Sequence, residues 1–336
     1  MTDKAVSRCF VAGHRGLVGS AIVRALKRAG YREPIVRPRS ELDLLDQRAV
    51  AQFFREEKPE VVFLAAARVG GIGANDTYRW DFLYENLVIQ TNILGSALDT
   101  GVERVVFFGS SCIYPRLADQ PIKEEYLLTG PLEHTNEPYA IAKIAGLKLV
   151  DAANSQFGRK WISLMPTNLY GPNDNFDLEK SHVLPALIRK FHEAKEARAA
   201  GGNASVTIWG QGTARREFLH VDDAADAALL MMESGVTGLY NVGSGSDLPI
   251  RELAEIVARV VGYDGPVNWD ASKPDGTPRK LMDSSRIREK GWAPRISLED
   301  GIRATYRWYL ENRDAEVRGV KRHEHARDAE TRRIAL

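Results

Sequence analysis

Groups that could act on a carbonyl compound stand in two short stretches of the sequence. "FFGSSCIYP" (107–115) ends an apolar run with two hydroxyls and a thiol, and "YAIAK" places Tyr139 and Lys143 four residues apart. Residues four apart on a helix share a face. A lysine ammonium can lower the pKa of a tyrosine, which then exchanges a proton with a carbonyl or alkoxide oxygen while a serine hydrogen-bonds that oxygen. The two stretches therefore predict carbonyl reduction or its reverse.

A glycine-rich stretch near the N-terminus could bind the cofactor that such a reaction needs. "GHRGLVG" lies between a predicted strand and a predicted helix. Glycines there allow a tight turn and let backbone N–H groups approach a pyrophosphate at the helix N-terminus. A turn that is merely rich in glycine is the alternative, but the strand–turn–helix context favours a dinucleotide site. The predicted phosphate loop consists of Gly13, His14, Arg15, Gly16, Leu17, Val18 and Gly19.

The choice between NAD and NADP depends on the end of the second predicted strand. NAD sites usually carry an acidic residue there, which binds the ribose diol. This sequence instead reads "VRPRS", with Arg37 and Arg39, and Arg15 adds a third cation from the glycine loop. Arginines pair well with a doubly charged 2′-phosphate, so NADP is predicted. For any one of the three, a solvated surface position is the alternative.

Strand-like and helix-like segments alternate through the first half of the chain. The strands are short continuous apolar runs, as expected for a parallel sheet that is covered on both faces, so the pattern predicts a doubly wound α/β (Rossmann) fold. The predicted strands are 8–13, 34–38, 60–66, 103–109 and 161–166. The helical spacing of apolar residues predicts helices over 17–30, 46–58, 81–101 and 137–158.

The rhythm changes after about residue 172, which predicts a nucleotide-binding domain over 1–172 and a smaller substrate lobe over 173–312. A strand near 238–244 is expected to return to the first domain. The other elements predicted in the second lobe are 184–199, 205–210, 222–233 and 249–262. In "HVDD", Asp222 or Asp223 is expected to cap the helix that follows.

The composition excludes several broad classes of protein. The 336 residues carry a formal net charge of +1, so no overall field would attract nucleic acid or an anionic membrane. No apolar run approaches a membrane-spanning length, and no signal peptide or metal site is expected. Cys9 and Cys112 could form at most one disulfide, which favours a cytoplasmic setting. The charged stretch 313–336 is expected to be a disordered tail rather than a segment packed on a partner subunit.

Longer stretches around these motifs resemble the extended short-chain dehydrogenase/reductase family. The similarity covers about residues 6–312 and is carried by "AGHRGLVGSAI", "LAAARVGGIGAN", "GSSCIYP", "TNEPYAIAKIAG", "MPTNLYGPNDNF", "REFLHVDD" and "DASKPDGTPRK". Within the family it is similar to members that convert GDP-4-keto-6-deoxy-D-mannose to GDP-L-fucose by 3,5-epimerisation and 4-keto reduction. The resemblance therefore implies that substrate, NADPH as cofactor and a homodimer.

The resemblance also implies roles for individual residues. Cys112 and His182 match the base and acid that invert carbons 3 and 5 of the sugar from opposite faces. Ser110, with Ser111 as an open alternative, matches the serine that acts with the tyrosine and lysine on the oxygen at carbon 4. The further cofactor contacts that it implies are Arg39, Asp43, Leu44, Gly109, Ser110, Lys143, Pro166, Thr167, Asn168, Leu169 and His182. The implied substrate contacts are Lys190, Trp209, Arg216 and Lys280.

The implied dimer would form from helices 81–101 and 137–158, packed as a four-helix bundle. Both helices carry apolar residues beyond one core face, and in the second helix these are Ile141, Ile144, Leu147 and Val150.

Three other functions are compatible with parts of this pattern. An NAD-retaining 4-epimerase of the same fold is disfavoured by the basic "VRPRS" and by Cys112 and His182. A 4,6-dehydratase would be expected to carry an acidic pair beside the serine, and "GSSC" has none. A catalytically silent NADP-sensing regulator is disfavoured because Ser110, Tyr139 and Lys143 are all present.

Overall fold

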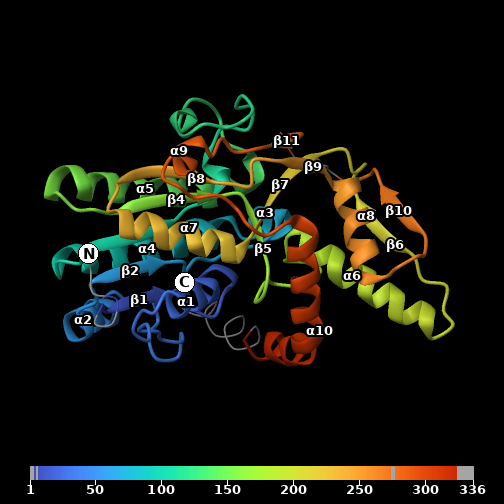
Figure 1. Ribbon diagram of the computed structural model, residues 1–336, viewed down its shortest axis with the longest axis horizontal. Helices are drawn as coiled ribbons and strands as arrows, with labels where there is room; N and C mark the ends of the chain where they lie inside the picture. The colour runs from blue at the N-terminus through green and yellow to red at the C-terminus, as the bar shows by residue number, and fades with distance from the viewer. Residues whose placement is uncertain (1–3, 5–6, 274–276, 324–336) are drawn as a thin grey trace, which may run out of the picture.

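A five-stranded parallel sheet forms the centre of the larger lobe. The computed structural model describes residues 4, 7–273 and 277–323 of the chain. The strands lie in the order β1-β2-β3-β4-β8, and every neighbouring pair is parallel. Their bounds are β1 Cys9–Ala12, β2 Val61–Leu64, β3 Arg104–Phe108, β4 Ile162–Pro166 and β8 Gly238–Val242. The predicted doubly wound fold is confirmed, and β8 returns to this sheet from the second half of the chain (Figure 1).

Helices cover both faces of this sheet because its strands are apolar on both sides. One face packs against α1 (Leu17–Arg28) and α7 (Val221–Ser234), and the other against α2 (Gln47–Glu57), α4 (Arg79–Asp99) and α5 (Glu137–Phe157). The boundaries of α5 follow from its sequence, since Pro138 lies in its first turn and Gly158 ends it in the left-handed conformation. The short α3 (Ile72–Thr77) precedes α4.

The chain changes direction across the sheet beside β1. Phe10 forms a parallel bridge to Ile35 on one side of β1, while β2 pairs with β1 on the other. The predicted strand at 34–38 is therefore reduced to one bridge, and its following residues leave the sheet. Ligands of doubly wound sheets bind at such a switch point, outside the carboxyl ends of the strands. The glycine loop after β1 lies there.

The second lobe has its own apolar core, at the right of Figure 1. Its helices are α6 (Val183–Ala199), α8 (Ile250–Val261) and α10 (Leu298–His323), and they pack with the parallel pair β6 (Val206–Trp209) and β10 (Val267–Asp270). A small sheet joins the lobes and contains β5 Asn168–Tyr170, β7 Arg215–His220, β9 Asp247–Pro249 and β11 Arg279–Lys280. The remaining short helices are α9 Ser285–Arg288, η1 Ser111–Ile113, η2 Glu124–Tyr126 and η3 His134–Asn136.

Two expectations about helix surfaces need correction. Helix α10 continues to His323, so the expected tail is helical over 313–323, and 324–336 lie outside the described residues. In α5, Leu147 and Val150 are buried in the core of the same chain, whereas Ile141, Leu149 and Phe157 are exposed. The apolar outer face of α5 therefore includes the predicted Ile141, but it has Leu149 and Phe157 in place of Leu147 and Val150.

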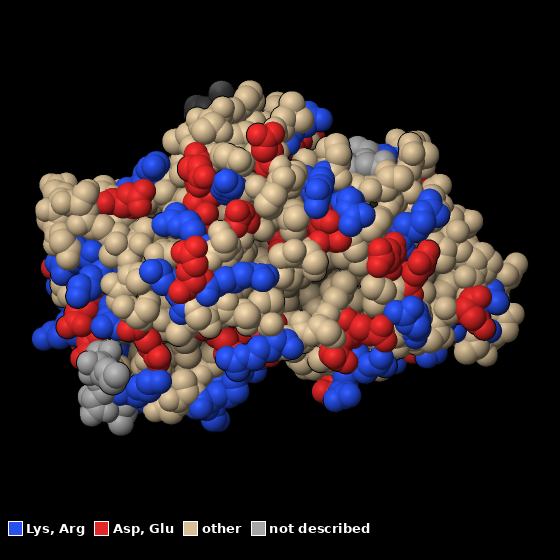
Figure 2. Space-filling view, turned by 45° about the horizontal axis from the view of Figure 1, so that its top comes forward, with Lys and Arg blue, Asp and Glu red and all other residues tan. Residues whose placement is uncertain are grey.

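Charge is distributed without large regions of one sign on the face shown in Figure 2, where basic and acidic side chains alternate. This agrees with the net charge of +1, and it means that an anionic ligand must be bound by a local group of cations. Within the described residues, no helix is both long and apolar enough to cross a membrane.

Candidate active site

The glycine loop after β1 has the shape of an anion-binding turn. Gly13 has φ +87°, and a Cβ there would lie 2.8 Å from the backbone nitrogen of Ala66. A Cβ on Gly19 would lie 2.1 Å from the carbonyl oxygen of Gly13, so neither position accepts a side chain. Gly16 precedes α1 and gives it no side-chain cap. The first N–H groups of α1 are therefore left for a phosphate.

One of the three arginines predicted for the 2′-phosphate, Arg37, is paired within the protein. Arg37 hydrogen-bonds Glu57 of α2, and its guanidinium lies 5.7 Å from the centre of the Phe53 ring. Arg39 is exposed, with its guanidinium 3.7 Å from Asp43, and Arg15 is also exposed. Arg39 and Arg15 remain candidates, while Arg37 is bound to the protein.

The small residues after β3 lead into a short 3₁₀ helix, and the two serines there differ in burial. The oxygen of Ser110 accepts a long hydrogen bond of 3.4 Å from the backbone N–H of Cys112. Ser110 is half-buried, whereas Ser111 is only 5% exposed. A Cβ on Gly109 would overlap the side chain of Met165, so this turn packs closely on β4. Of the two serines, Ser110 is the one that a substrate can reach.

Tyr139 and Lys143 lie on the same side of α5, above the end of β3. The Lys143 ammonium donates to the carbonyl oxygen of Phe108 at 2.9 Å and lies 5.8 Å from the centre of the Tyr139 ring. Burial lowers the pKa of Lys143 to about 8. The pKa of Tyr139 is raised, first by burial and then by Cys112. In the protein on its own, burial therefore outweighs any lowering of the tyrosine pKa by the lysine.

Cys112 and His182 belong to one electrostatic cluster with Lys280. Cys112 is 7% exposed; burial raises its pKa, while Lys280, a hydrogen bond with Ser110, and Lys143 lower it. His182 immediately precedes α6, and burial among protein atoms and the charge of Lys280 lower its pKa. The imidazole is thus neutral near neutral pH. Lys280 thus acts on both a potential thiolate base and a neutral imidazole.

The segment that carries His182 is held by the loop after β2. The backbone N–H of Gly71 donates to the carbonyl oxygen of Lys180 at 2.9 Å. A Cβ on Gly71 would lie 2.8 Å from the carbonyl oxygen of Ser181, which explains the glycine in "VGGIG". The sequence "LAAARVGGIGAN" thus supports the position of His182.

The residues after β4 are fixed from β7. The Asn168 side chain donates to the carbonyl oxygen of Glu217 at 2.8 Å, and the Thr167 hydroxyl donates to the same oxygen at 3.2 Å. Pro166 ends β4, and Leu169 follows Asn168 in β5. The predicted cofactor stretch 166–169 therefore lies beside β7, the strand that carries Arg216.

The four predicted substrate residues fall at two places in the second lobe. Trp209 is 61% exposed because β6 alternates buried and exposed residues, and the Lys273 ammonium lies 5.5 Å from its ring. Lys190 donates to the carbonyl oxygen of Thr207 in the same strand. Arg216 and Lys280 are aligned across the parallel pair β7–β11. The alternative of a core tryptophan at 209 is wrong.

Glu217, a fully buried carboxylate in β7, was not predicted from the sequence as a site residue. Its two oxygens accept the backbone N–H groups of Met282 at 3.0 Å and Gly245 at 2.7 Å. A Cβ on Gly243 would lie 2.5 Å from one of these oxygens. The available signal was an acidic residue inside the strand pattern "REFLH".

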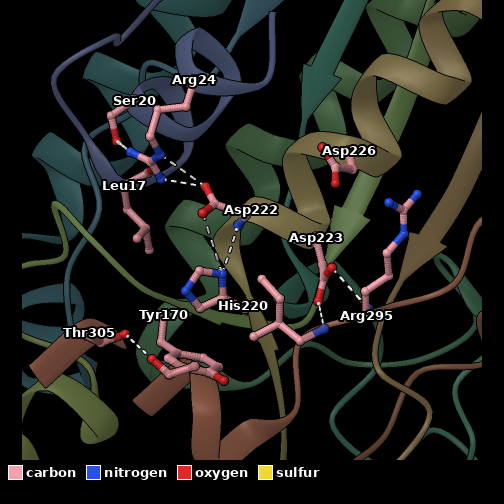
Figure 3. A network of polar contacts seen from close by, with 12 residues as sticks. Leu17, Ser20, Arg24, Tyr170, His220, Asp222, Asp223, Asp226, Arg295 and Thr305 are labelled. Carbon is pink, nitrogen blue, oxygen red and sulfur yellow. Dashed lines mark hydrogen bonds and ion pairs between the residues drawn. The ribbon is translucent and has the colours of Figure 1, made fainter. Parts of the chain in front are cut away.

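"HVDD" connects the two sides of the site, and its capping residue differs from the prediction. The N-cap of α7 is His220, whose Nδ1 accepts the N–H of Asp222 at 3.2 Å. Figure 3 shows Asp222 facing Arg24 of α1, at 2.6 Å, and Asp223 facing Arg295. Neither aspartate is the cap. Asp222 instead ties α1 to the first turn of α7.

Comparisons with known proteins agree with this arrangement. The NAD dependent epimerase/dehydratase family matches residues 9–243. A GDP-L-fucose synthase 1 from Arabidopsis thaliana is 57% identical over 93% of this chain and 95% of its own length, and a GDP-L-fucose synthase from Escherichia coli (strain K12) is 55% identical over 91% and 98%. A solved GDP-L-fucose synthetase from Naegleria fowleri bound to NADP has 28% identity and a TM-score of 0.83, over 94% of this chain and 97% of that chain.

Proposed function

The chain belongs to the NAD dependent epimerase/dehydratase family and, within it, to the GDP-L-fucose synthases, and on this premise we propose that it converts GDP-4-keto-6-deoxy-D-mannose to GDP-L-fucose. The observation that supports this best is the cluster of Cys112, His182 and Lys280 beside Ser110 and Tyr139. A reductase or a 4-epimerase needs only the serine, tyrosine and lysine. A cysteine and a histidine supply the extra acid and base that 3,5-epimerisation requires.

The residues of the first lobe fit NADPH as the cofactor. The uncapped start of α1 and the glycine cradle fit its pyrophosphate, and the exposed Arg39 and Arg15 fit its 2′-phosphate. Asp43 and Leu44 would line the adenine, and His14, Leu17 and Val18 would complete the loop. When bound, NADPH supplies the hydride for carbon 4 of the sugar.

Epimerisation at carbons 3 and 5 would use the ketone as an electron sink. Cys112 as a thiolate removes the proton next to the carbonyl, and the electron pair moves to oxygen 4. Ser110 and Tyr139 donate hydrogen bonds to this oxygen as charge develops on it. His182 first takes up a proton from water and then, as the imidazolium, returns a proton to the opposite face of the same carbon. The cycle repeats at the second carbon after protons are exchanged with water.

Reduction at carbon 4 would use the same oxygen-binding groups. Tyr139 gives its phenolic proton to oxygen 4 as the carbonyl carbon is reduced. Burial raises the pKa of Tyr139, so the hydroxyl is fully protonated before the step. Lys143 lies beside its ring and offsets the negative charge that the phenolate acquires. Asn168, fixed by Glu217, would orient the nicotinamide or the sugar.

The GDP end of the substrate would lie along the second lobe. Trp209 offers an exposed aromatic face for stacking, and Lys190 stands beside it on α6. Arg216 and Lys280 are paired across β7 and β11 and supply positive charge, which in the case of Lys280 also acts on Cys112. A diphosphate bridging these places would be paired by cations at both ends.

Arg39→Ala is expected to weaken NADPH binding while leaving NADH binding nearly unchanged. The loss of a charge-assisted phosphate contact corresponds to about 1.5–3 kcal/mol. Binding is measured by titrating each cofactor against protein fluorescence. Arg37→Ala is the matched control, because Arg37 is bound to Glu57 and should leave both affinities alone. Equal losses for both cofactors in the Arg39 variant would show that this arginine has only a structural role.

We further infer a homodimer formed through the outer faces of α4 and α5. Ile141, Leu149 and Phe157 are exposed on α5, and Trp80 and Tyr84 are exposed and stacked on α4. Leu149→Glu should convert a dimer into a monomer, measured by light scattering. Leu310→Glu, at a similarly exposed leucine on α10, is the control. A single-chain mass for the unmodified protein at micromolar concentration would refute the dimer.

We also propose a cytoplasmic setting, which the two free cysteines support. The function itself is tested by incubating the protein with NADPH and GDP-4-keto-6-deoxy-D-mannose and analysing the sugar product by NMR. GDP-L-fucose is expected. A 6-deoxy product with unchanged configuration at carbons 3 and 5 would indicate a reductase, and no NADPH consumption would indicate a binding protein.

A further inference from the structure

Lys280 is held in place by backbone contacts on both sides of β11. It is aligned with Arg216 in the parallel pair β7–β11. On the other side, the N–H of Ile122 donates to the carbonyl oxygen of Leu281 at 2.7 Å. The Gln120 side chain accepts the N–H of Leu281 at 2.8 Å. The strand β11, which carries Lys280, thus lies between β7 and the segment that follows the "SSCIYP" turn.

The buried carboxylate of Glu217 fixes the segment that directly follows β11. Glu217 is 0% exposed and accepts the N–H of Met282, two residues beyond Lys280. The apolar side of this strand is also fixed, because Met282 packs in one core cluster with Ile113 and Tyr114, which directly follow Cys112. Lys280 and Cys112 are therefore held on segments that pack against each other.

Within residues 4, 7–273 and 277–323, no hydrogen bond or ion pair involves the ammonium of Lys280. Its electrostatic neighbours are Cys112, Arg216 and Glu133. Glu133 already accepts the N–H groups of Thr135 and Asn136. Cys112 is the first of these neighbours in the size of its interaction with Lys280.

The base role proposed for Cys112 requires a positive charge near its sulfur, which Lys280 supplies. Burial disfavours the thiolate, and a thiol that remains protonated cannot remove a proton from carbon. Four interactions oppose the burial: the charge of Lys280, whose influence is the largest, then the Ser110 hydrogen bond, Lys143 and a backbone hydrogen bond. Lys143 already donates to Phe108, and Tyr139 adds no positive charge. The charge of Lys280 also disfavours the imidazolium form of His182.

We propose that Lys280 is a positioning residue that acts through Cys112, with its ammonium stabilising the thiolate in the free enzyme, in addition to any contact with the GDP sugar. The part played in epimerisation rests on the proposed function. The effect of the ammonium on the Cys112 pKa does not, because it acts in the protein before substrate binds. The two roles of Lys280 can therefore be separated in the protein without substrate.

The test is a pH titration of the Cys112 thiolate by its ultraviolet absorbance, taken as the difference from Cys112→Ser. Burial raises the pKa of Cys9, the other cysteine, to about 12, so it does not interfere. Lys280→Met and Lys280→Gln should both move the midpoint to higher pH, with about a tenfold loss of thiolate at neutral pH for each unit. Lys280→Arg, which keeps the charge, should restore the midpoint.

Lys190→Met is the matched control. Lys190 is a half-buried lysine of the same lobe whose pKa is lowered by burial alone, and it donates to Thr207. It should leave the Cys112 midpoint unchanged even where it raises KM for the GDP sugar. An unchanged midpoint in both Lys280 variants, or an equal shift in Lys190→Met, would overturn the proposal.

A second readout follows solvent deuterium entering carbons 3 and 5 of the GDP sugar. The pH profile for this exchange should shift with the thiolate midpoint in Lys280→Met and recover in Lys280→Arg. A shifted thiolate midpoint with an unshifted exchange profile would overturn the role in epimerisation. Absence of exchange in the unmodified protein would instead refute the proposed function and leave the thiolate result standing.

Discussion

Cys112→Ser is expected to lose the exchange of the protons on carbons 3 and 5 by about 10²–10⁴-fold while continuing to reduce the ketone. The thiol ionises near pH 8.5 in a free chain, and a serine hydroxyl hardly ionises at all. Serine also keeps nearly the same size at a position that is only 7% exposed. The product should be a 6-deoxy sugar with the manno or talo configuration, identified by NMR after turnover in deuterated water.

Cys9→Ser is the control for this experiment. Cys9 is 1% exposed in β1 and packs in the core between the sheet and α1. Its replacement could lower stability but should leave the ratio of epimerised to unepimerised product unchanged. GDP-L-fucose formed at the normal rate by Cys112→Ser would refute the assignment of the base, and the cysteine of "GSSC" would then be a packing residue.

Tyr139→Phe is expected to lower reduction of the ketone by about 10²–10⁴-fold, because it removes the proton donor for oxygen 4. NADPH affinity should change little, since Lys143 keeps its bond to Phe108 and the glycine loop is untouched. The measurement combines NADPH oxidation with a fluorescence titration of the cofactor. Proton exchange at carbons 3 and 5 should fall less, because Ser110 still hydrogen-bonds the oxygen.

Tyr170→Phe is the matched control for the lost hydroxyl. The Tyr170 hydroxyl donates to the carbonyl oxygen of Leu298 at 3.2 Å in the second lobe. This variant should keep its kcat while losing a little stability, about 0.5–1.5 kcal/mol for one hydrogen bond. Reduction that proceeds at the normal rate in Tyr139→Phe would contradict the tyrosine's role as the acid.

Much of the fold could be predicted because its signals are local. The glycines of the phosphate loop and the Tyr139–Lys143 spacing each lie within one strand–turn–helix or one helix. The apolar runs of the strands indicate a sheet buried on both faces. The strand expected at 34–38 was overpredicted, since Ile35 alone pairs with β1. A propensity pattern cannot show where pairing partners end.

The predictions that were wrong or missing concern residues whose surroundings come from distant segments of the chain. Arg37 lies two residues before Arg39 in sequence, but its partner is Glu57 on α2. Leu147 was expected outside and is buried, because α5 packs along both α4 and the sheet. Glu217 and Lys280 acquire their environment from segments that are more than sixty residues apart, as the bond from Met282 to Glu217 shows. No local spacing encodes such a neighbourhood.

The position of β8 has a consequence for synthesis of the chain. Ile162 in β4 pairs with Gly238 in β8, so the nucleotide sheet closes only after the chain has emerged through α6, β6, β7 and α7. Until then β4, whose five residues are all buried in the finished protein, forms an open apolar edge. On the ribosome, the first lobe therefore waits for part of the second before it is protected from aggregation.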